Sequence, residues 1–216
     1  MKNLILILTL FFSIILTFGQ NDSNTFFDEF SILLNKTDVK NYNTNDRIGL
    51  GIGVYLKFFD THKVNILFGF EYNRTSQFKK NMCEGHFANS TDITYYINSI
   101  SVPITMRINI GNRLKAFIES GTFLDLNAGA RRKGVMHTCL PNDSNQVECK
   151  EFDFEENAGV SSINYGISFG IGIIIPISKI KLVIKPDYKF GVGALYDDYG
   201  DQIYNRYFRV ILGIII

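Results

Sequence analysis

The sequence predicts an all-β fold, an eight-stranded antiparallel transmembrane β-barrel, and three observations carry this prediction. Apolar and polar residues alternate over runs of about ten residues or more, which is the period of a β-strand with one apolar face. The connections between these runs are short and long in turn, as in barrels whose strands cross a membrane. The composition favours strands, with 19 Phe, 11 Tyr and 18 Gly among 216 residues and only 4 Pro.

Residues 1–20 precede the first of these runs and are excluded from the fold. Lys2 is followed by an uncharged, mostly apolar stretch over 4–18, and a polar sequence begins after Gly19. This order of basic, apolar and small residues is typical of a secretory signal peptide. A membrane anchor is the alternative, but the stretch is shorter than the roughly 20 residues that a spanning helix needs. We therefore expect residues 21–216 to form the mature barrel domain.

The first four expected strands lie in the N-terminal half of the chain. The run 26–35 is the weakest, because Asp28 falls on its apolar face, and we include it since barrels of this type have an even number of strands. In 48–58, Ile, Leu, Val and Phe at even positions alternate mainly with Gly. In 64–73, Val, Ile and Phe alternate with Asn, Gly and Glu, and in 96–110 Ile, Val and Met alternate with Ser, Thr and Arg. Each pattern predicts a strand with one apolar and one small or polar face.

The remaining four runs repeat this pattern. In 116–128, Ala, Ile and Leu oppose Glu, Gly and Asp, and in 165–175 Ile and Phe oppose Gly and Ser. In 181–192, Leu, Ile and Phe oppose Lys and Asp, and in 207–216 Phe, Val, Leu and Ile oppose Tyr, Arg and Gly. Bulky apolar faces suit contact with lipid, and faces that mix small residues with both signs of charge suit a narrow interior containing ion pairs.

The connections also alternate in length. Those at 60–63, 111–113 and 178–179 are tight, so the chain ends are expected at the same rim as these turns. The longer polar connections, expected as loops at the opposite rim, cover residues 36–46, 79–93, 131–160 and 197–203. A soluble secreted or periplasmic β-barrel that holds an apolar ligand inside, with its apolar faces turned inward, is the alternative.

Several of these segments are similar to a known family. The stretches 68–75 (FGFEYNRT), 100–104 (ISVPI), 117–124 (FIESGTFL), 165–172 (YGISFGIG) and 188–191 (YKFG) resemble the small outer-membrane β-barrel family of Bacteroidetes that is described as PorT-like. The resemblance extends over nearly the whole mature chain and rests on strand patterns rather than on catalytic motifs. It implies an outer-membrane barrel of about this size.

The inward faces of the expected strands carry both signs of charge. An eight-stranded barrel is just wide enough for side chains to fill, so no diffusion pore is expected. These charges can form a paired plug, because buried charges are tolerated when they are paired, or a path for ions or protons. The residues expected in this interior network are Glu71, Arg107, Glu119, Asp125, Lys181, Lys185, Asp187, Lys189 and Arg209.

Three cysteines, Cys83, Cys139 and Cys149, fall in the expected outer loops. An exported protein meets an oxidising compartment, so we expect a disulfide, with Cys139 and Cys149 as the first choice and a pair that includes Cys83 as the alternative. His86 and His137 lie close in sequence to two of the cysteines, so a metal site in the loops is an alternative to the disulfide. A hydrolase at the outer rim would combine these histidines with Asp92, Asp143 or Ser144.

The partner classes follow from charge and location. The formal net charge of +1 argues against a dedicated nucleic-acid binder. Outer-membrane lipid is the expected surrounding, and the basic residues 131–133 are either a solvated rim or a contact for lipopolysaccharide. The acidic stretch 148–156, which contains two Phe, could bind a cationic partner. We expect no cofactor, no metal and no enzymatic activity, and a structural or surface-interaction role through the outer loops.

Overall fold

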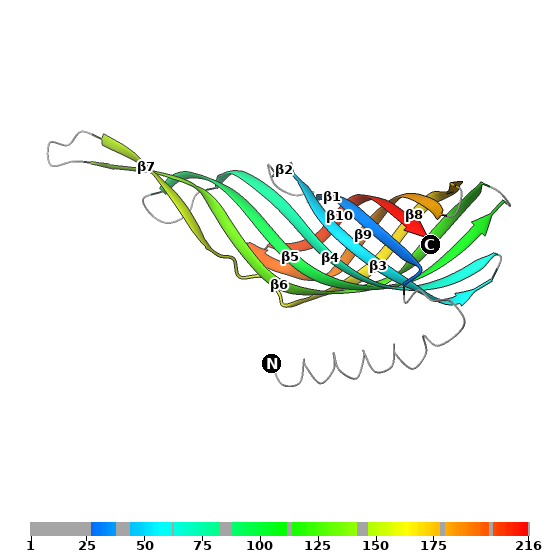
Figure 1. Cartoon of the computed structure of the whole chain (residues 1–216). Coiled ribbons are helices and arrows are strands. Elements are labelled where there is room, and N and C mark those ends of the chain that lie inside the picture. The colour runs from blue at the N-terminus through cyan, green and yellow to red at the C-terminus, as the bar shows by residue number, and fades with distance from the viewer. Residues whose placement is uncertain are drawn as a thin grey trace.

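The computed structural model describes residues 27–37, 44–61, 63–82, 88–111, 114–141, 147–177, 180–198 and 201–215. This part of the chain folds almost entirely into ten β-strands (Figure 1). In chain order the strands are β1 (Glu29–Thr37), β2 (Thr44–Asp46), β3 (Ile48–Asp60), β4 (Val64–Met82), β5 (Ala88–Ile110), β6 (Lys115–Pro141), β7 (Val147–Asn157), β8 (Ile163–Ile177), β9 (Ile180–Asp198) and β10 (Asp201–Ile215). The described residues include no helix of the length and apolar character needed to cross a membrane.

Eight of the strands close into a ring by antiparallel pairing. Around the ring the order is β1, β3, β4, β5, β6, β8, β9 and β10, and β10 pairs again with β1. The two other strands lie outside the ring, where β2 pairs with the far end of β4 and β7 pairs with the far end of β6. The prediction of an all-β, eight-stranded antiparallel barrel is confirmed.

The predicted alternation of faces is also present in the structure. In β8, Ile167 and Phe169 are exposed on the outer wall, and the intervening Gly166 and Ser168 are buried inside. The same division holds around the ring, because successive side chains of a strand point to opposite faces of the sheet. Bulky apolar side chains therefore cover the outside of the barrel, and small, polar and charged side chains fill its interior.

The first strand is more regular than its sequence suggests. β1 begins at Glu29, so Asp28 lies just before the strand and not on its apolar face. The Asp28 carboxylate accepts a hydrogen bond of 2.7 Å from the backbone N–H of Lys57 on β3. Within β1 the inward residues are all buried, and Glu29 is one of them.

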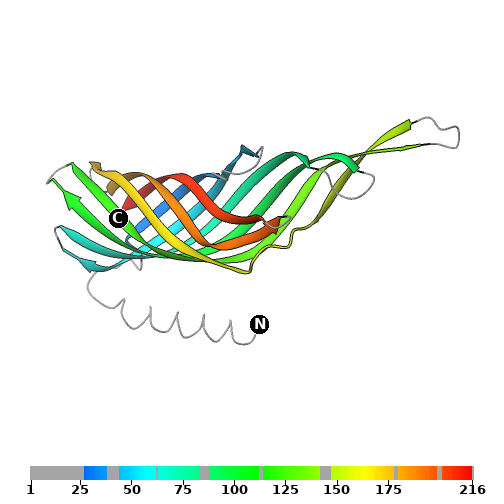
Figure 2. The same ribbon diagram turned by 180° about the vertical axis from the view of Figure 1, so that it is seen from behind.

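The expectation of long outer loops is wrong, because the strands continue through most of these segments. β4 and β5 extend over much of 79–93, β9 and β10 occupy most of 197–203, and 36–46 contains β2. The segment 131–160, expected as one loop, is largely a β-hairpin made by the end of β6 and by β7. This β6–β7 hairpin projects beyond the other strands (Figures 1 and 2). The short connections are as expected, and the one after β5 begins at Gly111, whose φ of 98° favours glycine.

Interior glycines make room for inward aromatic rings. A Cβ atom on Gly69 of β4 would lie 2.6 Å from Cδ1 of Tyr55 and 2.7 Å from Cγ of Pro103. Tyr55 has little freedom to move away, because its hydroxyl donates a 2.7 Å hydrogen bond to Glu71 and its side chain is buried. A glycine at position 69 is therefore required by the packing of the interior.

We expect Gly69→Ala to lower the free energy of unfolding by about 1–3 kcal/mol, the usual cost of forcing extra atoms into a packed interior. Urea unfolding of the protein in detergent micelles, followed by circular dichroism, measures the change. Gly129→Ala is the matched control, because no atom lies within 4 Å of its Cβ position. Equal effects of the two substitutions on the free energy of unfolding would show that the packing of the Tyr55 ring does not require a glycine at position 69.

Candidate functional site

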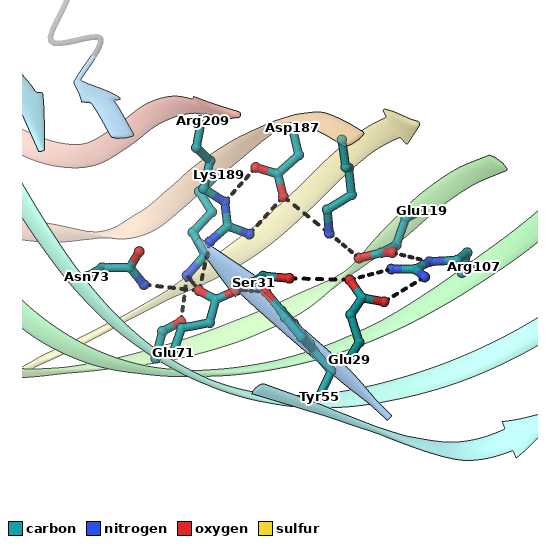
Figure 3. Close-up of polar contacts among 12 residues, drawn as sticks. Glu29, Ser31, Tyr55, Glu71, Asn73, Arg107, Glu119, Asp187, Lys189 and Arg209 are labelled. Atoms are coloured by element: carbon teal, nitrogen blue, oxygen red, sulfur yellow. Dashed lines mark hydrogen bonds and ion pairs between the residues drawn. The ribbon is translucent and has the colours of Figure 1, made fainter. Parts of the chain in front are cut away.

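A chain of ion pairs passes through the interior of the barrel (Figure 3). Its members are all buried, they alternate in sign, and they come from β1, β4, β5, β6, β9 and β10. In order along the network they are Glu29, Arg107, Glu119, Lys185, Asp187, Arg209, Glu71, Lys189 and Asp125. Each base thereby contacts two acids, which is the arrangement expected of a paired plug.

The first part of the network lies toward the rim with the short connections. Arg107 donates to Glu29 from Nη1 at 2.9 Å and to Glu119 from Nε at 2.7 Å. The Nζ of Lys185 lies 2.5 Å from the other oxygen of Glu119 and 3.7 Å from Asp187. Four different strands are thereby joined through two carboxylates and two bases before the network reaches Asp187.

The second part of the network lies closer to the opposite rim. Arg209 binds Asp187 through two nitrogens, Nε at 2.5 Å and Nη2 at 2.7 Å, and it reaches Glu71 through Nη1 at 2.7 Å. Lys189 lies 3.1 Å from Glu71 and 3.3 Å from Asp125. The two-nitrogen contact of Arg209 uses the planar shape of the guanidinium group, which a lysine could not reproduce.

Uncharged groups complete the network. Tyr55 and Asn73 both donate hydrogen bonds to Glu71, and Lys189 donates one of 2.5 Å to the hydroxyl of Ser101. Inward aromatic rings cover the cations. The guanidinium of Arg107 lies 4.4 Å from the centre of the Phe117 ring, and the ammonium of Lys189 lies 4.5 Å from that of Phe123.

Apolar side chains lie beyond the network at both rims. The cluster at the rim with short connections comes from the ends of β6, β8, β9 and β10 and consists of Phe117, Ile174, Val183 and Ile215. The cluster at the opposite rim consists of Ile97, Ala130, Leu195, Tyr196 and Ile203. The Tyr196 ring also stacks on Tyr95 with centroids 5.2 Å apart. The interior thus changes from apolar to charged to apolar along its length, and this filling favours a plug over a conducting path.

Eight of the nine residues expected in the interior from the sequence lie in this network, and Lys181 does not. Lys181 has inward parity but is exposed, because it is the second residue of β9, at the rim. The expectation for Lys181 is therefore wrong. Glu29 was not expected, and it is buried beside Arg107. Its position on the odd-numbered face of the first strand, opposite Phe30 and Ile32, is the signal that could have identified it.

The β6–β7 hairpin contains the disulfide and His137, whereas Asp92 lies on β5. Cys139 and Cys149 are bonded to each other across the two strands. Nδ1 of His137 lies 3.1 Å from a carboxylate oxygen of Glu151. Among the described residues no three His, Cys, Asp or Glu side chains are grouped to hold a metal ion. Cys83, His86, Asp143 and Ser144 lie outside the described residues, so the alternatives that involve them remain predictions.

Opposite charges face each other across the barrel-proximal part of this hairpin. Arg131 and Lys133 both contact Glu155, at 3.2 and 2.7 Å, and Arg132 contacts Glu156 at 2.5 Å. The hydrogen bond from Lys133 is the main reason why the pKa of Glu155 lies below its usual value. The basic segment expected as a lipopolysaccharide contact and the acidic segment expected to bind a cationic partner therefore partly neutralise each other.

The comparisons with known proteins concern architecture. No family model and no curated protein matches the chain. Among solved structures, Ail, the attachment invasion locus protein of Yersinia pestis, is 14% identical with a TM-score of 0.39, covering 87% of this chain and 97% of Ail. Neisserial surface protein A is 11% identical with a TM-score of 0.48, covering 87% of this chain and 94% of that one. The N-terminal β-barrel domain of Pseudomonas aeruginosa OprF is 9% identical with a TM-score of 0.36, covering 88% and 98%. At these identities and scores the likeness assigns neither family nor function.

We expect Glu71→Gln to destabilise the barrel by about 3–5 kcal/mol, because it leaves the buried Arg209 and Lys189 without one of their two acids. The urea concentration at which the protein unfolds in detergent micelles would fall accordingly. Glu155→Gln is the control, since the same change at an exposed ion pair should leave stability nearly unchanged. Similar stabilities for the two variants would mean that the interior charges are solvated rather than paired.

Proposed function

We propose that residues 21–216 form an integral β-barrel of a bacterial outer membrane, exported by the signal peptide 1–20, that acts without enzymatic activity as a surface-interaction protein. The observation that carries this proposal is the apolar outer wall. Large apolar side chains are exposed on all eight ring strands, for example Ile52 at 63% and Phe169 at 61%. In water such a continuous apolar surface would cause association, whereas in a bilayer it faces lipid.

The closed ring supports the same proposal. Every ring strand pairs with a neighbour on both sides, so the backbone N–H and C=O groups of the barrel wall are satisfied without water. A groove of about 540 Å³ on the outer wall is lined by apolar side chains that include Phe30, Ile52, Phe70 and Leu212. An acyl chain of a lipid matches both the chemistry and the position of this groove.

The filled interior favours this proposal over the alternatives. A soluble carrier of an apolar ligand needs an apolar cavity, and the middle of this barrel is occupied by buried ion pairs. Among the described candidates for a hydrolase, His137 forms a cross-strand contact with Glu151, which is an ordinary structural role. The similarity of five strand segments to the PorT-like family of Bacteroidetes supports the same class of membrane barrel.

Cell fractionation followed by electrophoresis with and without boiling tests the location. We expect recovery in the outer membrane and a change of mobility on heating, because a closed barrel resists detergent until it is heated. Recovery in the soluble fraction without a mobility change would contradict the proposal and favour the soluble ligand-binding alternative.

Deletion of residues 135–153 should leave the barrel folded and remove only surface interactions. The pairing of β6 with β8 over Lys115–Leu126 does not involve the deleted segment, which takes from the ring only the partners of the first residues of β5, Ala88–Asp92. We expect the heat-dependent mobility change to persist at the same temperature. Loss of that change would show that the hairpin is needed for assembly. In that case a variant that carries a scrambled segment of the same length should also fail to assemble.

A further inference from the structure

The β6–β7 hairpin carries one strand edge that is not used within the described part of the chain. β6 is flanked by β7 on one side and by β5 on the other, where pairing continues as far as Thr138. β7 pairs with β6 alone. The hairpin projects from the barrel in both views, so this edge of β7 lies away from the ring strands (Figures 1 and 2).

Two observations establish which backbone groups point toward that edge. The N–H of Ala158 donates to the carbonyl of Ala130, which sets the hydrogen-bonded positions of the β6–β7 ladder at every second residue. Cys139 and Cys149 face each other with their Cα atoms 4.0 Å apart, as expected for the closer, non-hydrogen-bonded pairs. By this alternation Glu151, Asp153 and Glu155 direct their N–H and C=O groups away from β6.

These three residues place their carboxylates on one face of β7. Glu151 faces His137, and Glu155 is shared by Arg131 and Lys133. Asp153 faces Val135 across the ladder, it is exposed, and no ion pair of its carboxylate occurs among the described residues. At the middle of the free edge, the negative charge of Asp153 is therefore not balanced by a basic residue of β6.

The opposite face of β7 is apolar in its central part. Phe152 is 51% exposed, and Phe154 packs close to Gly134, where a Cβ atom would lie 2.9 Å from its ring. A strand added to the free edge would thus meet acids on one face and aromatic rings on the other. A second copy of β7 would oppose acid with acid at this edge, which disfavours self-association.

We propose that the free edge of β7 binds an extended segment of a partner protein by antiparallel strand addition. The segment that fits has Lys or Arg at every second position, opposite Glu151, Asp153 and Glu155, and apolar residues between them. Main-chain hydrogen bonds would provide affinity, and the alternating side chains would provide specificity. This inference rests on the proposed function, which places the hairpin outside the membrane at the cell surface.

Synthetic heptapeptides of alternating Lys and Val, titrated against the intact protein in detergent micelles, test the proposal. Methylation of the backbone nitrogens of the Lys residues should weaken binding at least tenfold, because those N–H groups face β7. Methylation of the Val nitrogens should leave binding nearly unchanged, because those groups point to the far side. This comparison does not alter the protein, so loss of folding cannot explain its outcome.

Variants of β7 test the same edge from the other side. Asp153→Asn should weaken binding several-fold, and Asp153→Pro, which also removes the outward N–H, should weaken it further. Glu148→Gln is the matched control, because it removes a carboxylate from the same strand but on the opposite face, where Glu148 contacts Lys150. Retention of the mobility change on heating checks that each variant remains folded.

Three outcomes would overturn the proposal: equal binding of both methylated peptides, equal effects of Asp153→Asn and Glu148→Gln, or self-association of the protein that the Lys–Val peptide displaces. A protein that behaves as a membrane barrel but shows any of these results contradicts only this inference. A protein recovered as soluble contradicts the proposed function itself, whatever it binds.

Discussion

The chain of ion pairs in the interior is the interaction on which the rest of the barrel depends, because a narrow closed ring isolates its inward charges from bulk water. Removing one partner of a buried ion pair leaves an uncompensated charge, which is strongly destabilising. Each base here contacts two acids, and several of the pairs join residues remote in sequence, as with Glu71 and Arg209, which are separated by 138 positions. A register slip of one residue would turn these charges onto the apolar outer wall. The network therefore ties strand register to barrel closure.

The remaining interior is built to accommodate that network. Aromatic rings such as Phe117 and Phe123 lie over the cations, where they exclude water and interact favourably with positive charge. Their bulk requires small neighbours: a Cβ atom on Gly172 would lie 2.4 Å from the Phe117 ring. Large inward rings and interior glycines thus fill the interior together, and the bulky aliphatic residues lie on the outer wall.

The sequence was sufficient to predict the ring and most of its interior, because a strict period of two assigns every residue of a strand to a face. It was less informative at the ends of strands. Lys181 has the right parity but lies at the rim, and parity alone does not reveal depth. The β6–β7 hairpin was missed for a different reason. In this hairpin the two strands are held together by cross-strand charge pairs, such as that of Arg132 with Glu156, and by a disulfide. Its apolar face is confined to the central part of β7, so the hydrophobic pattern that marks the other strands is weak there.

The same features that hid the hairpin from the sequence pattern make its edge suited to recognition. An unpaired strand edge is a template for indiscriminate association, and charged side chains along it are a common protection. The bond between Cys139 and Cys149, together with the ion pairs of Glu155, holds β7 in a fixed extended shape, so little order has to be gained when a partner strand is added. Because the protecting charges are acidic, they exclude acidic and neutral strands more strongly than basic ones. Protection against wrong partners and selection of a basic partner therefore follow from the same side chains.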